Sequence, residues 1–274
     1  MKQSASDAWR AVGRPGTGPE ISLVMPCYNE EAIVAQTIRR TLHAFQVPGY
    51  RLELVAVDNG SHDRTGEIIK QFEAAGAGVK HVRVEKNQGY GFGILSGIPH
   101  CTAPWIGFIP ADSQVDAEDT VRLYEEALAC EEAVVVKARR RFRMDGFTRK
   151  VVSVTYNLLF RTLWPSIASF DINGLPKLMP REVVRRMQLS SSDWFLDPEI
   201  MIKSHYLGVR CIEYNVFARM RSRGLSHVSA ATCVNFFSGL IRYRFSNTLS
   251  AWRRGLVSSR EIAAHEAGAA RADS

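Results

Sequence analysis

Strand-like apolar runs alternate with helical patterns along the first half of the chain. The runs lie at Ile21–Met25, Leu52–Val57, Val79–Val84, Trp105–Ile109 and Ala133–Val136. After the first run, apolar residues recur from 33 to 45 as they do on one face of a helix, and Pro48-Gly49 ends the pattern. Strands separated by helices are typical of βαβ units. The pattern therefore predicts an α/β fold with a mostly parallel, Rossmann-like central sheet flanked by helices.

The second half of the chain is less regular. Helical spacing is still clear at residues 65–72 and 121–128, but the alternation fades after residue 140. There we expect a helix near Val151–Leu163, a loop at Asp171–Pro180, a helix near Pro198–Tyr206 and a strand near Val209–Val216.

The ends of the chain differ in composition from its middle. Residues 1–19 are rich in Gly, Pro and Ser and lack an apolar h-region, which indicates a flexible arm and not a signal peptide. Residues 20–230 are expected to form one α/β domain. Residues 231–274 are expected to form a basic, aromatic helical extension with a frayed end. No apolar stretch reaches the roughly 18 residues that a membrane-spanning helix needs.

Composition narrows the classes of partner. With 274 residues, of which 46% are hydrophobic, the chain can bury one large core. The net charge of +7 favours an anionic partner: nucleotide phosphates, a nucleic acid or an acidic membrane face. The five cysteines show no CxxC spacing, so reduced thiols are favoured over disulfides or a zinc site.

Polar segments follow the first three predicted strands. They are Met25–Glu30, Val57–Thr65 and Asn87–Gly93. Because ligands of open α/β sheets bind beyond the carboxyl ends of the strands, we expect these segments to converge on one ligand site. A tyrosine face such as that of Tyr28 can stack on a base, and the Asp58 carboxylate can accept a base N–H or a ribose hydroxyl. Asp58 and Asn59 also fit a simple Asx turn before Gly60.

Glycines alternate in the third of these segments, at 89, 91 and 93. They would let the backbone approach a ligand closely and begin a helix whose amides favour phosphate. The spacing G-x-G-x-G differs from G-x-G-x-x-G, which disfavours a dinucleotide-binding oxidoreductase. A plain tight turn remains an alternative.

The segment after the fourth run reads Pro-Ala-Asp-Ser-Gln, from 110 to 114. Oxygen ligands from Asp112 and Gln114 suit Mg²⁺ or Mn²⁺, which would bridge and neutralise diphosphate oxygens. Asp112 also fits an acidic loop that leads into a helix.

Basic residues are concentrated at 137–143 and 149–150. The spacing of Arg149, Ser153 and Asn157 places three polar groups on one helical face. Arginine binds phosphate through a planar, permanently charged fork. Basic runs are also common on solvated surfaces.

Together, these ordered motifs over residues 20–230 resemble the family-2 glycosyltransferases of the GT-A fold, and among them the dolichol- or polyprenyl-phosphate sugar synthases. The resemblance implies a UDP- or GDP-sugar donor, inverting transfer and usually Mg²⁺ or Mn²⁺. It implies that the nucleotide lies at Pro26, Tyr28, Glu30, Asp58, Asn59, Asn87, Gly89 and Asp112, and the metal at Asp112 and Gln114. It implies that the acceptor or its phosphate lies at Arg139, Arg140, Arg149, Ser153 and Arg221.

The chain departs from the resembled pattern at three positions. Asn59 replaces a second acidic residue, Pro110 replaces the first aspartate of D-x-D-x-Q, and His227 replaces a lysine after Arg221. Because a proline side chain cannot ligate a metal, a weaker site that depends on donor phosphates and water is expected.

Asp197 and Glu199 occupy the region where inverting relatives place an acidic residue near the acceptor. With Arg149, they are the predicted catalytic residues. A hydroxyl acceptor needs a general base, whereas an ionised phosphate does not. Asp197-Pro198 also fits a helix N-terminus, which gives both carboxylates a purely structural alternative.

These observations predict an enzyme that transfers a sugar from a nucleotide-sugar to a polyprenyl phosphate. A soluble hydroxyl acceptor and a non-catalytic nucleotide-sugar-binding protein are the alternatives. Nucleic-acid binding is disfavoured because no recognition signature is present. We expect a cytoplasmic protein whose residues 234–257, which mix aromatic and basic side chains, contact the inner membrane face.

Overall fold

A computed structural model describes residues 17–143, 147–218 and 230–256, and their side chains except at 141–143, 147–153 and 230–236. The chain divides into two compact units, residues 1–227 and 228–274.

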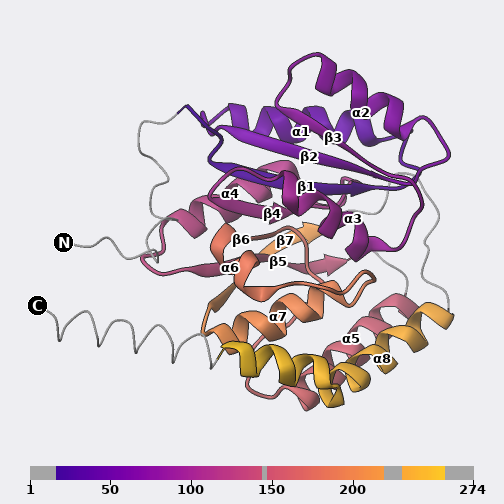
Figure 1. Ribbon diagram of the computed structural model, residues 1–274, viewed down its shortest axis with the longest axis vertical. Helices are drawn as coiled ribbons and strands as arrows, with labels where there is room; N and C mark the ends of the chain where they lie inside the picture. Colours follow the sequence, from indigo (N-terminus) through magenta and orange to yellow (C-terminus); the bar gives the residue numbers. More distant parts are fainter. Residues whose placement is uncertain (1–16, 144–146, 219–229, 257–274) are drawn as a thin grey trace, which may run out of the picture. The chain divides into compact units, whose positions relative to one another are not determined.

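The first unit is built on a seven-stranded sheet of order β3-β2-β1-β4-β6-β5-β7 (Figure 1). Its strands are β1 (Ile21–Cys27), β2 (Leu52–Asn59), β3 (Val79–Val84), β4 (Trp105–Phe108), β5 (Val134–Arg143), β6 (Lys177–Pro180) and β7 (Arg210–Ala218). Strand β6 pairs antiparallel with both β4 and β5, and the remaining neighbours pair in parallel. The predicted mostly parallel α/β sheet is confirmed.

Helices follow the strands in the expected alternation. They are α1 (Val34–Gln46), α2 (Thr65–Ala74), α3 (Tyr90–Gly97), α4 (Ala117–Leu128), α5 (Phe147–Leu163), α6 (Arg181–Met187) and α7 (Leu196–Leu207), with a short 3₁₀ helix at Ile98–His100. Because side chains alternate across a strand, β1 turns Leu23 and Met25 into a buried core that also contains Ile38 and Phe45 of α1 and Leu123 of α4. This packing fixes α1 and α4 on the sheet beside the carboxyl ends of β1 and β4.

Two elements of the second half were not predicted. Residues 177–180 form β6, where a loop was expected, and α6 follows directly. Lys177 begins the strand and is completely buried, so its charge concealed the strand from the hydrophobic pattern. Its compensating partner is Asp197, twenty residues later in the sequence.

The second unit contains α8 (Ala230–Phe245) and a further helical stretch at 247–256 after a bend at Ser246. Among the residues described in both units, no helix is long and apolar enough to cross a membrane.

Candidate functional site

The loops that follow β1 and β2 are joined by hydrogen bonds. The Ser61 hydroxyl accepts the Asn29 N–H at 3.1 Å, and the Asn29 side-chain oxygen accepts the His62 N–H at 2.9 Å. The Thr65 hydroxyl accepts the Glu30 N–H at 2.8 Å. These contacts hold the first two polar segments together at one edge of the sheet, where the sequence pattern predicted that they would meet.

The Asp58 carboxylate lies completely buried at this edge. One oxygen accepts the Ser61 N–H at 2.9 Å, which forms the Asx turn considered as an alternative. The other oxygen pairs with the Arg83 guanidinium of β3. Asp58 therefore stabilises the loop through the Asx turn and holds the partly exposed Arg83 guanidinium in an ion pair. Its predicted contact with a nucleotide stays a prediction.

Asn59 presents an unsatisfied acceptor at the same place. Its side-chain N–H₂ donates to the Gly89 carbonyl at 2.9 Å, but its side-chain oxygen is buried and has no hydrogen-bond partner among the described residues. Asn59 itself is only 3% exposed. Buried polar atoms are normally paired, so this oxygen is an exception in the fold. A base N–H or a ribose hydroxyl has the chemistry to pair with it, but would reach it only if the Asn59 side chain moved.

The alternating glycines serve packing within the chain. Gly89 has a φ of +113°, and its N–H donates to the Asn87 side-chain oxygen at 2.8 Å. A Cβ at Gly91 would lie 2.3 Å from the Ser191 carbonyl oxygen, and the Phe92 N–H donates to the Ser192 carbonyl at 2.7 Å. The segment at 191–193 thus explains Gly89 and Gly91 without a ligand, whereas a Cβ at Gly93 would meet the side chains of Pro26 and Asn59. Asn87 and Gly89 nevertheless lie beside Asn59, as predicted.

Asp197 and Glu199 are both buried in α7 and paired with lysines. Asp197 forms an ion pair with Lys177, and Glu199 forms one with Lys203 at 2.6 Å. Burial lowers the pKa of the Lys177 ammonium to about 8, although Asp197 works in the opposite direction. Carboxylates held in this way stabilise the fold and are not exposed to an acceptor. The structure therefore favours the structural alternative for both predicted catalytic residues.

Two exposed residues near α3 were not among the predicted site residues. Asp193 is an exposed carboxylate, and its backbone lies against Gly89 and Gly91. Trp194 is 41% exposed and stacks on Tyr90, with ring centroids 4.8 Å apart. The sequence contained Asp193 in the acidic stretch before α7, but only the fold shows which of its carboxylates reaches the surface.

Arg140 is committed to a partner within the chain. Its guanidinium donates to both oxygens of Asp171, each at 2.9 Å, and to the Asn173 carbonyl at 2.8 Å. Burial tends to lower the pKa of Arg140, but Asp171, with Asp197 and Asp112 farther away, raises it overall. Because Asp171 occupies the fork, the predicted phosphate grip by Arg140 is not supported.

Arg139 has a different setting. Its guanidinium lies over the exposed Phe170 ring, 4.1 Å from the ring centroid. Three further predicted residues fall outside the described side chains, namely Arg149, Ser153 and Arg221. Asn157, on the predicted face of α5, accepts the Ile172 N–H at 3.1 Å and so ties this helix to the Asp171 turn.

The predicted metal residues lie in the loop between β4 and α4. Asp112 is nearly buried, and one of its oxygens accepts the Gln114 N–H at 3.1 Å. A carboxylate and an amide oxygen are hard ligands that fit Mg²⁺ or Mn²⁺. In the described part of the chain, no group of three or more His, Cys, Asp or Glu side chains could hold a metal. Any ion bound here would therefore take other ligands from a substrate diphosphate and water.

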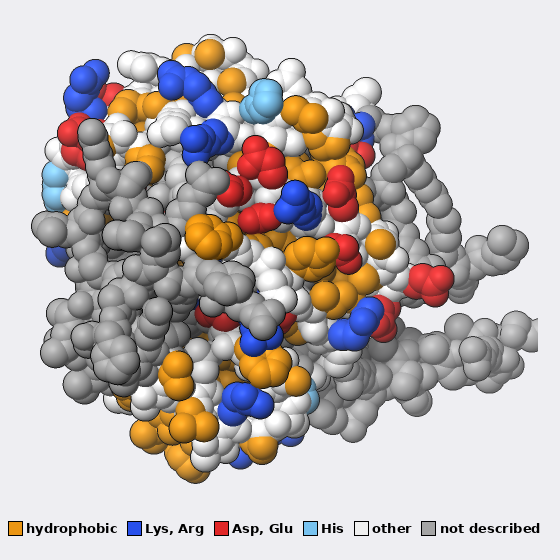
Figure 2. Space-filling model, turned by 180° about the vertical axis from the view of Figure 1, so that it is seen from behind, with side chains coloured by type: hydrophobic (Ala, Val, Ile, Leu, Met, Phe, Trp, Pro, Cys, Tyr) orange, Lys and Arg blue, Asp and Glu red, His pale blue; other side chains and the backbone are white. Residues whose placement is uncertain are grey.

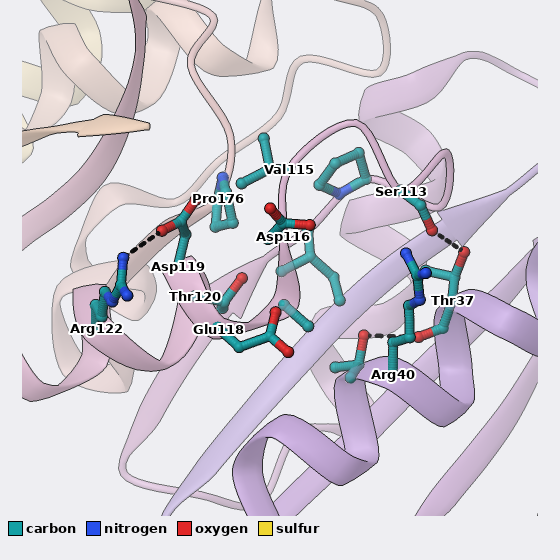
Figure 3. Close-up of a pocket in the computed structure, with 14 residues that line it drawn as sticks. Thr37, Arg40, Ser113, Val115, Asp116, Glu118, Asp119, Thr120, Arg122 and Pro176 are labelled. Carbon is teal, nitrogen blue, oxygen red and sulfur yellow. Dashed lines mark hydrogen bonds and ion pairs between the residues drawn. The ribbon is translucent and has the colours of Figure 1, made fainter. Parts of the chain in front are cut away.

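A cavity of about 460 Å³ lies on the other side of this loop, between α1 and α4 (Figure 3). Pro110 and Ser113 line it together with Thr37, Arg40 and Asp116, but none of the predicted nucleotide-binding residues does. The predicted nucleotide site at the ends of β1 and β2 and this cavity are therefore two different places on the first unit.

Charge is mixed on the face drawn in Figure 2. Asp and Glu side chains gather near its centre, and Lys and Arg side chains lie among and around them. Among the described side chains drawn on this face, Lys and Arg therefore do not form one continuous patch.

Residues 22–186 match Glycosyl transferase family 2, and the chain belongs to that family. The family was predicted from the motifs at 26–30, 58–61 and 110–114, and this prediction is confirmed. The chain is accordingly a family-2 glycosyltransferase.

Curated relatives are named for transfer to a lipid phosphate. The chain is 35% identical over 225 residues to undecaprenyl-phosphate 4-deoxy-4-formamido-L-arabinose transferase of Pectobacterium atrosepticum. The aligned region covers 81% of this chain and 66% of the relative. The chain is 32% identical over 152 residues to the transferase of the same name from Edwardsiella ictaluri, covering 55% and 46%. The chain thus spans less than two thirds of the length of these relatives.

Solved structures confirm the GT-A fold. Glucosyl-3-phosphoglycerate synthase from Mycobacterium tuberculosis, in complex with Mn²⁺, UDP and glucosyl-3-phosphoglycerate, superposes with a TM-score of 0.66 over 89% of this chain and 85% of that one, at 18% identity. The same enzyme with Mg²⁺ and UDP gives a TM-score of 0.65, at 19% identity and 84% coverage of each chain. At this identity the likeness concerns the fold.

Proposed function

We propose that this protein transfers a sugar, with inversion, from a UDP- or GDP-sugar to a polyprenyl phosphate. The observation that supports the donor site is the meeting of three polar segments at one edge of the sheet, joined by the Asn29–Ser61, Glu30–Thr65 and Asn59–Gly89 hydrogen bonds. The names of the curated relatives support the lipid-phosphate acceptor. The nucleotide would lie along Pro26, Tyr28 and Glu30, with Asn59 accepting a hydrogen bond from the base or ribose.

Asp112 and Gln114 would hold Mg²⁺ or Mn²⁺ beside the donor diphosphate. When bound, the ion would neutralise negative charge that builds up on the leaving diphosphate. With so few protein ligands, the ion and the nucleotide would bind together, because the diphosphate completes the coordination.

The acceptor phosphate would be gripped by Arg139, Arg149, Ser153 and Arg221. An oxygen of that phosphate forms the bond to the anomeric carbon while the bond from that carbon to the nucleoside diphosphate breaks. The attacking oxygen is already ionised, so no side chain needs to remove a proton. This fits a site whose α7 carboxylates, Asp197 and Glu199, are engaged with lysines.

The acceptor implies where the protein works. We propose a cytoplasmic location with peripheral contact to the inner membrane face through residues 234–257. Aromatic and basic side chains mixed in this way suit an anionic bilayer surface.

Transfer of labelled sugar from UDP- and GDP-sugars to a short-chain polyprenyl phosphate tests this proposal, with the uncharged polyprenol and soluble alcohols as parallel acceptors. We expect product with the phosphate alone. Asp193→Asn should leave that rate within a few-fold, since the amide still caps the Phe195 N–H that Asp193 accepts at 2.9 Å. Arg149→Ala should raise KM for the lipid phosphate.

Two results would replace the proposal. Efficient transfer to a soluble alcohol, lost by about 10²–10⁴-fold in Asp193→Asn, would establish the hydroxyl acceptor with Asp193 as general base. Nucleotide-sugar binding without turnover on any acceptor would establish the non-catalytic alternative.

A further inference from the structure

Thr37 of α1 connects that helix to the loop that carries Asp112. Its hydroxyl lies 2.9 Å from the Ala111 carbonyl oxygen and 2.7 Å from the Ser113 hydroxyl. Figure 3 shows the Ser113 hydroxyl turned toward the Thr37 hydroxyl, with both residues in the lining of the cavity. The two contacted residues are the immediate neighbours of Asp112 on either side.

The bridge is buried, and its polar groups depend on one another. Thr37 is 5% exposed, and Ala111 is similarly buried. The Thr37 hydroxyl has one proton, which it donates to the Ala111 carbonyl; the Ile33 carbonyl of its own helix lies 3.2 Å away. The Ser113 hydroxyl can then donate to the Thr37 oxygen. Without the Thr37 hydroxyl, the buried Ala111 carbonyl and the Ser113 hydroxyl would each lose a hydrogen-bond partner.

Ser113 needs such support because its backbone is left-handed, with a φ of +53°. Non-glycine residues rarely adopt this conformation, and they retain it when surrounding contacts enforce it. The turn at Ser113 also lets the Gln114 N–H reach back to the Asp112 carboxylate at 3.1 Å. By holding Ala111 and Ser113, the Thr37 hydroxyl therefore helps to orient the side chains of both predicted metal ligands, Asp112 and Gln114.

We propose that Thr37 is a positioning residue that holds Asp112 and Gln114 in the geometry that binds the divalent ion. The proposal rests on the metal-assisted donor site proposed above. In this proposal Thr37 itself would contact neither the ion nor the nucleotide. It acts through Ala111 and Ser113, as outer-shell partners of metal ligands do in other proteins, where their loss weakens metal binding by about 10–100-fold.

Metal binding can be measured without turnover. Electron paramagnetic resonance counts free Mn²⁺ during a titration of the full chain with UDP, and in parallel with GDP. We expect Thr37→Val, which keeps the side-chain shape but removes the hydroxyl, to raise the Mn²⁺ dissociation constant by about tenfold or more. Thr37→Ser should restore it to near the wild-type value. Nucleotide affinity in the absence of metal should change little in both variants.

Thr41→Val is the matched control. Thr41 lies one turn farther along α1, is equally buried and lines the same cavity. Among the described residues its hydroxyl donates within its own helix, to the Thr37 carbonyl at 2.9 Å. Its variant should bind Mn²⁺ as the wild type does. Ser113→Ala removes the loop side of the bridge and should weaken Mn²⁺ binding in the same direction, so the proposal can be judged even when Thr37→Val folds poorly.

The outcomes separate this proposal from the proposed function. If the wild type binds Mn²⁺ with a nucleotide and both Thr37→Val and Ser113→Ala match it, the positioning role is wrong while the donor site stands. Equal weakening by Thr41→Val would also overturn it, because general loosening of α1 would then be the cause. If the wild type binds no Mn²⁺ with either nucleotide, the donor site itself fails and the positioning role fails with it.

Discussion

Glu199→Gln is expected to lower the free energy of unfolding of the first unit by about 3–5 kcal/mol. The Glu199 carboxylate is completely buried, and it accepts the N–H groups of Ser190 and Ser191 at 3.1 and 2.9 Å. It also pairs with Lys203, which is itself buried, at 2.6 Å. A neutral amide would leave the Lys203 charge without its counterion in a place where solvation is poor. Urea denaturation with linear extrapolation measures the loss.

Glu182→Gln is the control variant, because it removes the charge of an exposed glutamate ion pair where Glu199→Gln removes the charge of a buried one. Glu182 pairs with Arg185 at 2.7 Å on the surface of α6, where the ion pair is well solvated. Such pairs contribute little, so this variant should be indistinguishable from the wild type in urea. Unchanged stability of Glu199→Gln combined with a large loss of turnover would contradict the structural role and return Glu199 to the catalytic residues.

Asp112→Asn is expected to reduce turnover by about 10²-fold or more and to weaken its dependence on Mn²⁺ or Mg²⁺. Metal ions contribute several kcal/mol by stabilising charge in the transition state, and each 1.36 kcal/mol corresponds to a factor of ten in rate. The amide oxygen can still accept the Gln114 N–H, so the loop itself should persist. Steady-state kinetics across a metal titration measure both effects.

Asp119→Asn provides the control in the same region. Asp119 lies in the first turn of α4 and pairs with Arg122 at 3.2 Å, away from the predicted ligands. Its variant should retain turnover within a few-fold. Wild-type turnover and wild-type metal dependence in Asp112→Asn would remove Asp112 from the metal site.

The sequence predicted the first half of the fold well because its signals are local. Each βαβ unit carries its own apolar run and its own helical spacing, and the β1 and β2 loops meet because parallel strands end at the same edge. Strand β6 escaped prediction because burial of Lys177 depends on Asp197, a partner on another element. A local hydrophobic pattern contains no information about such a pair.

The site was predicted less completely for the same reason. The motifs led to Asn59 and Asn87, which the fold brings together, but the chemistry left open to each predicted side chain depends on distant partners. Asp171 occupies the fork of Arg140, and the 191–193 segment explains Gly91. Asp197 and Glu199 matched the acidic pattern of a catalytic region, yet only the folded chain shows the lysines that hold them.

The most direct test of the account is the thermal stability of the protein with UDP, GDP and their sugar conjugates, each with and without Mn²⁺. A ligand that binds only the folded state stabilises it by mass action, by about 2.7 kcal/mol at a hundred times its dissociation constant. We predict a rise in Tm with one of the two nucleotides that is larger when Mn²⁺ is present, and no such rise with Mn²⁺ alone. An unchanged Tm with every nucleotide and sugar conjugate, with and without metal, would contradict the donor site on which the proposed function rests.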